Sequence, residues 1–193
     1  MIAKPPGWPF VIVWSTLALV IMYWASVPFW YGVEMLLAVV LVGLPLMVYW
    51  ALRFALAADR GGVTGRAGRC LAPWLITWAT VVALAYNAPF ALRFSLSASA
   101  LGAYAERIME RGPIHYESCE WAGLYRVCGG GAEHGSLDGV PVPGSAGFAT
   151  TEWAIYSNTG FAWHPGAVPQ ETADDIYVRI VGDWYGYHGW DGW

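Results

Sequence analysis

Three long apolar runs occupy the first half of the chain, and they constrain its fold more than any other feature. The runs are residues 8–27, 33–57 and 71–92. An α-helix of about 20 residues spans about 30 Å, which is the hydrocarbon thickness of a bilayer. Backbone polar groups in lipid must be bonded within their own segment, so runs of this kind predict helices and not strands. The sequence therefore predicts a three-helix transmembrane anchor over residues 1–93.

The composition agrees with lipid as the solvent of this half. Charged residues make up only 12% of the chain, against about 25% in an ordinary soluble domain. They are also unevenly placed: residues 1–92 hold five basic and two acidic residues, and residues 93–193 hold five basic and twelve acidic ones, so the halves carry +3 and −7 and sum to −4. An acidic second half argues against a nucleic-acid partner, which requires a basic surface.

The basic residues predict the direction in which the chain crosses the membrane. The loop between the second and third runs carries Arg60, Arg66 and Arg69, opposed only by Asp59. Short basic loops remain in the cytoplasm. This places the N-terminus inside and residues 94–193 outside. We therefore expect a multi-pass protein of the cell membrane with an extracytoplasmic C-terminal domain.

A cleaved signal peptide is the alternative interpretation of the first run. Its apolar core is longer than the usual ~7–15 residues, and Ala25-Ser26-Val27 is a poor match to a cleavage site. The sequence therefore favours a retained helix.

Polar residues within the runs are few. Glu34 lies at the outer start of the second run, where the helix dipole favours an acid, and Asn87 in the third run is expected to bond a neighbouring helix. Pro45 is expected to kink the second helix. A proton or ion site at Glu34 is the alternative, although functional acids usually lie deeper in the bilayer.

The second half reads as a small α+β domain, mainly antiparallel, with one leading helix. Residues 95–111 predict that helix, with an apolar stripe that ends at Gly112-Pro113. The stripe is formed by Leu101, Tyr104, Ala105 and Ile108. Strands are expected at residues 121–127, 148–156 and 176–184, and loops at 129–131 and 141–147.

The last of these strands has the clearest alternation. Apolar Ile176, Val178, Ile180 and Trp184 share one face, and Tyr177, Arg179 and Asp183 share the other. Alternation of this kind is typical of a half-buried strand.

Four short motifs follow the three runs in a fixed order. They are Arg93-Phe94-Ser95-Leu96-Ser97, Ala122-Gly123-Leu124-Tyr125-Arg126-Val127, Gly160-Phe161-Ala162-Trp163 and Gly182-Asp183-Trp184-Tyr185. In this order the chain resembles a group of uncharacterised actinobacterial integral membrane proteins. The resemblance implies an N-terminal helical anchor joined to a β-rich outer domain that closes on a Gly-Trp-Tyr strand. It implies no activity, cofactor or catalytic residue, and this chain departs from the pattern by continuing through residues 186–193.

Cys119 and Cys128 are the cysteines of the predicted outer domain. An oxidising compartment favours a disulfide between them. A straight strand over residues 121–127 would hold their Cα atoms roughly 25–30 Å apart, whereas a disulfide requires less than about 7 Å. A hairpin centred on Gly123-Leu124 would instead place them opposite one another. The strand and the disulfide exclude each other, and the sequence leaves both open.

Other candidate sites are weaker. His115, Glu117 and Cys119 would share a face of an extended segment and, with His134, His164 or His188, offer metal-ligand types without zinc-like spacing. No serine lies in a Gly-x-Ser-x-Gly elbow, and Asp174-Asp175 fits a solvated turn. The sequence therefore predicts no metal and no cofactor, and it leaves any catalytic residue unknown.

The C-terminal segment is rich in aromatic rings: Trp184, Tyr185, Tyr187, Trp190 and Trp193. Exposed flat rings form surfaces that bind sugars or proteins. The alternative, which is favoured, is that the rings pack onto the domain or lie in the membrane interface.

Three functions remain open at this point. The first is an envelope interaction or accessory protein that binds another protein or a glycan through its outer domain. The second is an envelope enzyme acting on a glycan or lipid, which needs a pocket with converging polar groups. The third is a transporter or channel subunit, which needs a polar seam along the helices that Glu34 and Asn87 scarcely provide.

Overall fold

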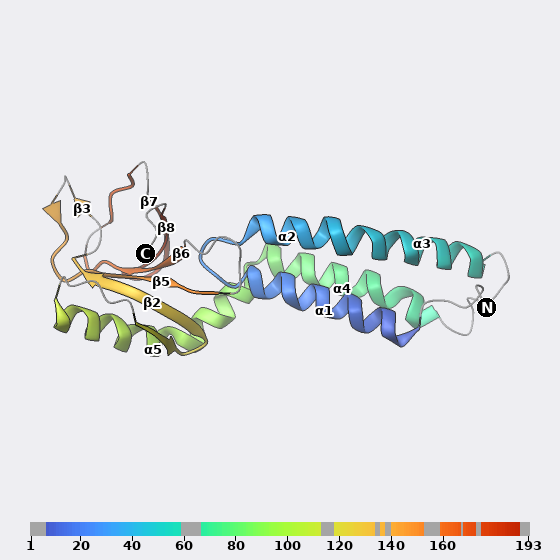
Figure 1. The fold of residues 1–193 in the computed structure, drawn as a ribbon, viewed down its shortest axis with the longest axis horizontal. Helices are drawn as coiled ribbons and strands as arrows, with labels where there is room; N and C mark the ends of the chain where they lie inside the picture. The colour runs from blue at the N-terminus through green and yellow to red at the C-terminus, as the bar shows by residue number, and fades with distance from the viewer. Residues whose placement is uncertain are drawn as a thin grey trace. The chain divides into compact units, whose positions relative to one another are not determined.

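The chain folds into a helical unit and a β-rich unit, drawn in Figure 1. The computed structural model describes residues 7–58, 67–112, 118–133, 136–137, 140–152, 159–166, 168–172 and 175–189. The helical unit comprises residues 1–25 and 31–89, and the β-rich unit comprises residues 26–30 and 90–193. The sequence predicted a contiguous division at residue 93, whereas in the structure a short segment, Ser26–Trp30, belongs with the second half.

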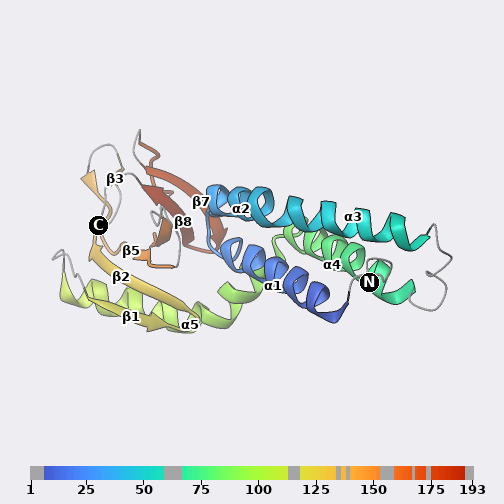
Figure 2. The ribbon, with the colours of Figure 1, turned by 45° about the vertical axis from the view of Figure 1, so that its right-hand side comes forward.

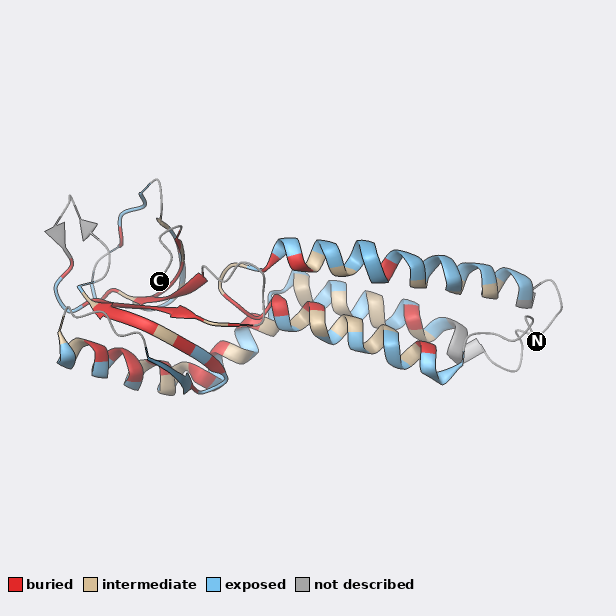
Figure 3. Cartoon of the chain, in the orientation of Figure 1, coloured by how far each residue is buried: buried red, intermediate tan, exposed pale blue. Residues whose placement is uncertain are grey.

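The helical unit contains four α-helices and a π-helical turn within its described residues. They are α1 (Trp8–Trp24), α2 (Gly32–Ala38), η1 (Val39–Gly43), α3 (Leu44–Ala58) and α4 (Ala67–Ala85). By length and composition, the continuous helix Gly32–Leu56 can cross a membrane by itself. Leu71–Ala85 and Ala88–Arg111 are long and apolar enough only when they are taken together, as a broken span or a re-entrant loop. Trp8–Trp24 is apolar but shorter. Figure 3 shows that α2 and α3 are coloured mostly as exposed.

The π-helical turn lies directly before Pro45, the residue expected to kink the second helix. Proline lacks the N–H that would bond the carbonyl of Leu41, and its ring crowds that carbonyl. Widening the backbone over Val39–Gly43 into a π turn accommodates the missing bond one turn before the proline. The sequence thus predicted an irregular helix at Pro45, and the structure shows that the irregularity is a π-helical turn.

The third apolar run is divided between two helices, where a single helix over residues 71–92 was expected. α4 ends at Ala85, and α5 (Ala88–Arg111) begins after a turn at Tyr86-Asn87. Asn87 adopts the left-handed conformation with φ of 51°, which asparagine tolerates better than most residues and which commonly ends helices. Pro89 follows in the first turn of α5, where its lack of an N–H costs nothing.

The β-rich unit is built on a six-stranded antiparallel sheet with the order β1-β2-β5-β6-β8-β7. These strands are β1 (Cys119–Ala122), β2 (Tyr125–Ala132), β5 (Ala146–Thr150), β6 (Thr159–Trp163), β8 (Trp184–Gly189) and β7 (Asp175–Val181). A separate two-stranded sheet pairs β3 (Ser136–Leu137) with β4 (Val140–Pro141). Helices followed by a mainly antiparallel β domain agree with the predicted order of elements.

Helix α5 covers one face of the six-stranded sheet, which we call the α5 face. Figures 1 and 2 show it running beside β2. The predicted stripe of Leu101, Tyr104, Ala105 and Ile108 is confirmed as its buried side. The Tyr104 ring meets Phe148 edge-on at 4.8 Å between centroids. The leading helix was expected to begin at residue 95. It begins at Ala88 instead, because the turn at Asn87 ends the preceding helix and residues 88–94 join α5.

Gly130 shows why part of β2 was mistaken for a loop. Residues 129–131 were predicted as a loop, but they lie in β2, where a bulge shifts the register between Cys128 and Gly131. A Cβ atom at Gly130 would lie 2.7 Å from Ile108 Cδ1 and 2.9 Å from the Gly147 carbonyl oxygen, and φ is +134°. Gly130 therefore serves close packing beneath α5 and not chain flexibility.

The Ser26–Trp30 loop packs on the same α5 face. Val27 is 1% exposed, and the Phe29 ring lies 5.6 Å from that of His188. Pro28 sits over Gly186 so closely that a Cβ atom at that glycine would be 2.3 Å from Pro28 Cβ. The loop is thus a packed part of the β-rich unit. The first helix was expected to continue to residue 27, and it ends at Trp24 because the following residues are used in this packing.

The strand expected over residues 176–184 is two strands joined by a tight turn. Gly182-Asp183 forms the turn, with Gly182 at φ of 57°, so Trp184 begins β8 instead of ending β7. The alternation along β7 holds from Ile176 to Arg179: Ile176 and Val178 pair with His188 and Gly186 on the α5 face, and Tyr177 lies on the other face. A register shift between Arg179 and Val181 then breaks it, so that Val181 pairs with Trp184 and Ile180 does not continue the predicted face. The burial of β7 is inverted, because Tyr177 is buried and Ile176 and Val178 are about half exposed.

Candidate functional site

The disulfide hairpin is the first feature of the β-rich unit with chemical consequence. Cys119 and Cys128 form a disulfide and are directly opposed in the β1–β2 ladder, with 4.1 Å between their Cα atoms. Gly123 and Leu124 form the turn, and Gly123 has φ of 65°. Of the two arrangements that the sequence left open, the structure has the hairpin, so the straight strand over residues 121–127 is wrong. The disulfide therefore links the edge strand β1 covalently to β2.

The hairpin turn is held by a buried cation, Arg93 of α5. Its Nη2 donates to the Leu124 carbonyl oxygen at 2.6 Å and to Glu152 Oε1 at 2.6 Å. Its Nη1 donates to Ser26 Oγ at 2.9 Å. Its guanidinium also lies 4.1 Å from the centre of the Tyr125 ring. Arg93, Glu152, Ser26, Leu124 and Tyr125, which we call the Arg93 cluster, therefore join α5, the hairpin, the Ser26–Trp30 loop and the segment after β5.

The Arg93 guanidinium has an ion pair and several hydrogen bonds, which a charge with so little exposure requires. The side chains of Arg93 and Glu152 are 11% and 2% exposed. Burial, the largest cause, raises the pKa of the Tyr125 hydroxyl, so this group stays protonated and donates to the Ser26 carbonyl oxygen at 2.8 Å. Ser97 closes the arrangement from α5, where its Oγ accepts the Leu124 N–H at 2.9 Å. These bonds fix geometry, and a planar guanidinium is suited to making several at once.

The part of the aromatic C-terminal segment that the structure describes is buried and does not form an exposed binding surface. Trp184, Tyr185 and Tyr187 are 7%, 5% and 1% exposed, because β8 lies inside the sheet between β6 and β7. Trp184 points to the α5 face and meets Phe94 at 6.1 Å. Trp190 and Trp193 lie outside the described residues. The favoured alternative, that the rings pack onto the domain, describes the three rings that the structure places.

The face of the sheet opposite α5 carries a buried layer of tyrosines around one histidine. Tyr177, Tyr185, Tyr187 and Ala162 form one buried cluster, and the His164 ring stands edge-on to Tyr177 and to Tyr185, 5.9 Å from each. Burial lowers the pKa of His164 to about 4. Gly160 makes room for this layer, since a Cβ atom there would be 2.3 Å from Tyr187 Cε1. His164 is therefore a neutral core residue at physiological pH.

The other polar candidates that the structure describes do not converge. His115, Glu117, His134 and Asp174 lie outside the described residues. His188 contacts Phe29 on the α5 face, and Ser145 is buried with its hydroxyl donating to the Val142 carbonyl oxygen at 2.7 Å. Within the part of the chain that the structure describes, no three His, Cys, Asp or Glu side chains gather as a metal site requires. Glu34 is a buried residue in the first turn of α2.

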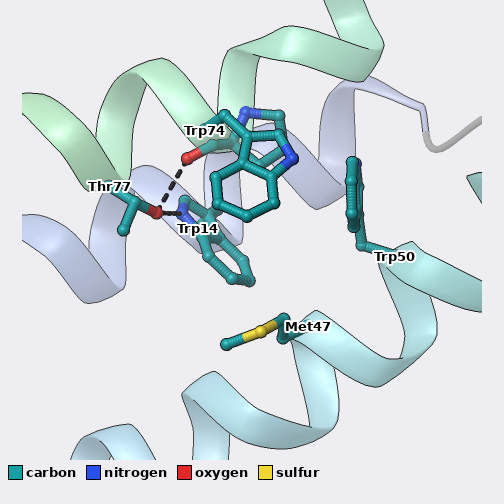
Figure 4. Close-up of a pocket in the computed structure, with 6 residues that line it drawn as sticks. Trp14, Met47, Trp50, Trp74 and Thr77 are labelled. Carbon is teal, nitrogen blue, oxygen red and sulfur yellow. Dashed lines mark hydrogen bonds between the residues drawn. The ribbon is translucent and has the colours of Figure 1, made fainter.

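The helical unit has a cavity of about 60 Å³ among α1, α3 and α4. Figure 4 shows its lining: Trp14, Met47, Trp50, Pro73, Trp74 and Thr77. Trp14 Nε1 donates to Thr77 Oγ1 at 3.1 Å, and that hydroxyl donates to the Pro73 carbonyl oxygen at 2.8 Å. Trp50 and Trp74 meet edge-on at 5.7 Å. The lining is thus apolar and aromatic, with its hydroxyl already bonded.

Sequence reasoning missed the Arg93 cluster. Arg93 was noted only as the first residue of a short motif, and Glu152 lay within the strand expected over residues 148–156. The available signal was Arg93 itself, because an arginine directly after an apolar run needs a partner, but no local pattern names residues 26, 124 and 152 as that partner.

Comparison with protein-family models, with curated proteins and with solved structures finds no match to this chain. Function must therefore be argued from the geometry alone.

Proposed function

We propose that the chain is a multi-pass membrane protein whose β-rich unit works outside the cytoplasm as an envelope interaction or accessory module. One observation carries the proposal. The continuous helix Gly32–Leu56 has 25 residues, and only 6% of its most apolar window is buried inside the protein. A helix that is apolar on all sides belongs in a core or in lipid, and this one is not in a core. Lipid is the solvent that removes the cost of exposing it, about 25 cal/mol per Å².

Two further helices support the proposal of three spans. α1 has 17 residues, about 25 Å at helical rise, and exposes Ile12 and Leu19 by more than 60%. In α4, Leu75 and Trp78 are 66% and 69% exposed. Each helix presents to its surroundings the side chains that lipid favours, and tryptophan at a helix end, as at Trp8 (62% exposed), suits the membrane interface.

Two independent arguments favour placing the β-rich unit outside. The arginines between the second and third helices favour a cytoplasmic loop there. The Cys119–Cys128 disulfide favours an oxidising compartment for the unit that holds it. With three crossings, both arguments give the same side.

The exposed surface of the β-rich unit supports an interaction role. Large apolar side chains project from it, including Trp121 at 69% and Val168 at 68% exposed. An exposed tryptophan such as Trp121 offers a large flat area with few rotatable bonds, which suits a contact position in an interface. We propose another envelope protein or a glycan as the partner.

Cysteine labelling of intact cells tests the topology. In a Cys70→Ser background with the disulfide retained, Arg126→Cys places a thiol on an exposed position of β2, and Gly7→Cys places one before α1. A membrane-impermeant maleimide is expected to label Arg126→Cys on intact cells, and Gly7→Cys only after permeabilisation. The reverse result overturns the proposed orientation.

In-cell crosslinking tests the interaction role. A photo-crosslinking residue at Trp121 is expected to give a discrete higher-mass product, and the same residue at buried Phe161 serves as the matched control. Recovery of the protein alone from both positions contradicts the proposed module.

A further inference from the structure

Strand β7 exposes apolar residues on the face of the sheet where burial is expected. Ile176, Val178 and Val181, which we call the β7 stripe, are 48%, 49% and 58% exposed. Their cross-strand partners on β8 are His188, Gly186 and Trp184, so the stripe lies on the α5 face. α5 contacts this face through Phe148, Phe161 and Trp184, and the Ser26–Trp30 loop covers Gly186 and His188. The stripe lies beyond both.

The charges of β7 are on the other face. Asp175 and Arg179 alternate with the stripe and share the face of Tyr177. The stripe is therefore an uncharged strip of β-branched side chains that begins next to Pro28 and Phe29. Trp30, the next residue of that loop, is 43% exposed.

The connections of the Ser26–Trp30 loop along the chain indicate what covers the stripe. The Ser26–Trp30 loop directly follows α1, which ends at Trp24, and directly precedes α2, which begins at Gly32. Pro28 is four positions along the chain from each of these helix ends, so it lies at most about 14 Å from either. If both helices span the bilayer, the loop emerges at its surface, and the strand residues on which the loop packs, Gly186 and His188 beside the stripe, lie close to that surface.

We propose that the β7 stripe, together with Trp30, rests in the outer headgroup region of the bilayer and is a lipid-contacting surface of the β-rich unit. The inference rests on the proposed membrane anchoring. Amphipathic tryptophan and an uncharged apolar strip are the chemistry that enters this region. The inverted burial of β7 then has a physical cause, because lipid takes the place of the protein core on that side.

Fluorescence quenching in vesicles tests the contact. The full chain in a Cys70→Ser background, with the Cys119–Cys128 disulfide intact, carries one added thiol labelled with bimane. The added cysteine is Val178→Cys or Ile176→Cys in the stripe, and Trp121→Cys serves as the control. Trp121 is 69% exposed, on the opposite face and in the opposite edge strand. The vesicles are phosphatidylcholine with phosphatidylglycerol, with and without a headgroup-nitroxide lipid.

Labels at residues 176 and 178 are expected to be quenched by the nitroxide lipid several-fold more than the label at residue 121, with blue-shifted emission. Equal quenching at the stripe and the control overturns the inference. Blue-shifted emission without lipid quenching also overturns it and indicates a protein partner or a second copy on the stripe. An alkaline carbonate wash separates the two proposals: release of the chain from the vesicles contradicts the anchoring, whereas retention with an unquenched stripe contradicts the lipid contact alone.

Discussion

The helical and β-rich units use the same kinds of side chain in opposite ways. In the helical unit, Trp74 and Trp78 are 58% and 69% exposed, whereas in the β-rich unit Tyr125, Phe148 and Phe161 are fully buried. Figure 3 shows the contrast between the sheet strands and the helices α2 and α3. Aromatic content therefore does not reveal where a core lies. The β-rich unit thus buries these rings in a core, whereas the helical unit exposes its tryptophans, as the proposed membrane anchoring requires.

The buried ion pair of the β-rich unit gives the sharpest test of that core. Glu152→Gln leaves the Arg93 guanidinium buried without its counter-charge, which is expected to cost about 3 kcal/mol of unfolding free energy. The exposed pair Arg107–Glu120, with both side chains 45% exposed, supplies the matched control, and Glu120→Gln is expected to cost less than ~1 kcal/mol. Chemical denaturation of the full chain in detergent, followed by near-ultraviolet circular dichroism, measures both. Equal losses would mean that the Arg93 cluster is not part of the core.

The pH dependence of stability tests the opposite face of the same sheet. His164 has a pKa of about 4 in the folded unit, below its unfolded value of about 6.5, so the folded state binds fewer protons. Its contribution is fully present above pH 6.5 and is lost as the pH falls from 6.5 toward 4. The loss is expected to be roughly 1 kcal/mol at pH 5.5. His164→Phe is expected to remove this part of the slope, and an unchanged difference between pH 7 and pH 5.5 would show that His164 is not the group responsible.

A smaller effect is expected in the helical unit, where interhelical hydrogen bonds contribute little. Thr77→Val removes the acceptor of the Trp14 indole N–H, and the expected cost is about 0.6 kcal/mol. Thr80→Val is the matched control, because Thr80 Oγ1 donates to the Ile76 carbonyl oxygen of its own helix. Unfolding of the reconstituted chain in bicelles compares them. If Thr77→Val lowered the free energy of unfolding as much as Glu152→Gln does, polar contacts would contribute equally in the two units and the contrast between them would not hold.

Much of the architecture was predictable because its signals are local. The apolar runs, the buried stripe of α5 from Leu101 to Ile108 and the alternation along β7 each depend on residues close in sequence. Local signals predicted the ends of the helices less well. The turn at Asn87 was hidden because its neighbours are apolar, and only the left-handed backbone of that residue divides the third run.

The sequence by itself determined which half of the chain is apolar, which half is acidic, and that two cysteines stand nine positions apart. Only the tertiary structure decided that those cysteines are opposed across a hairpin, that Ser26 and Glu152 meet Arg93, and that β8 is an interior strand with buried rings. The physical reason is the range of the interactions. Hydropathy and periodicity act between near neighbours, whereas burial of a ring or pairing of a charge depends on residues that only folding brings together.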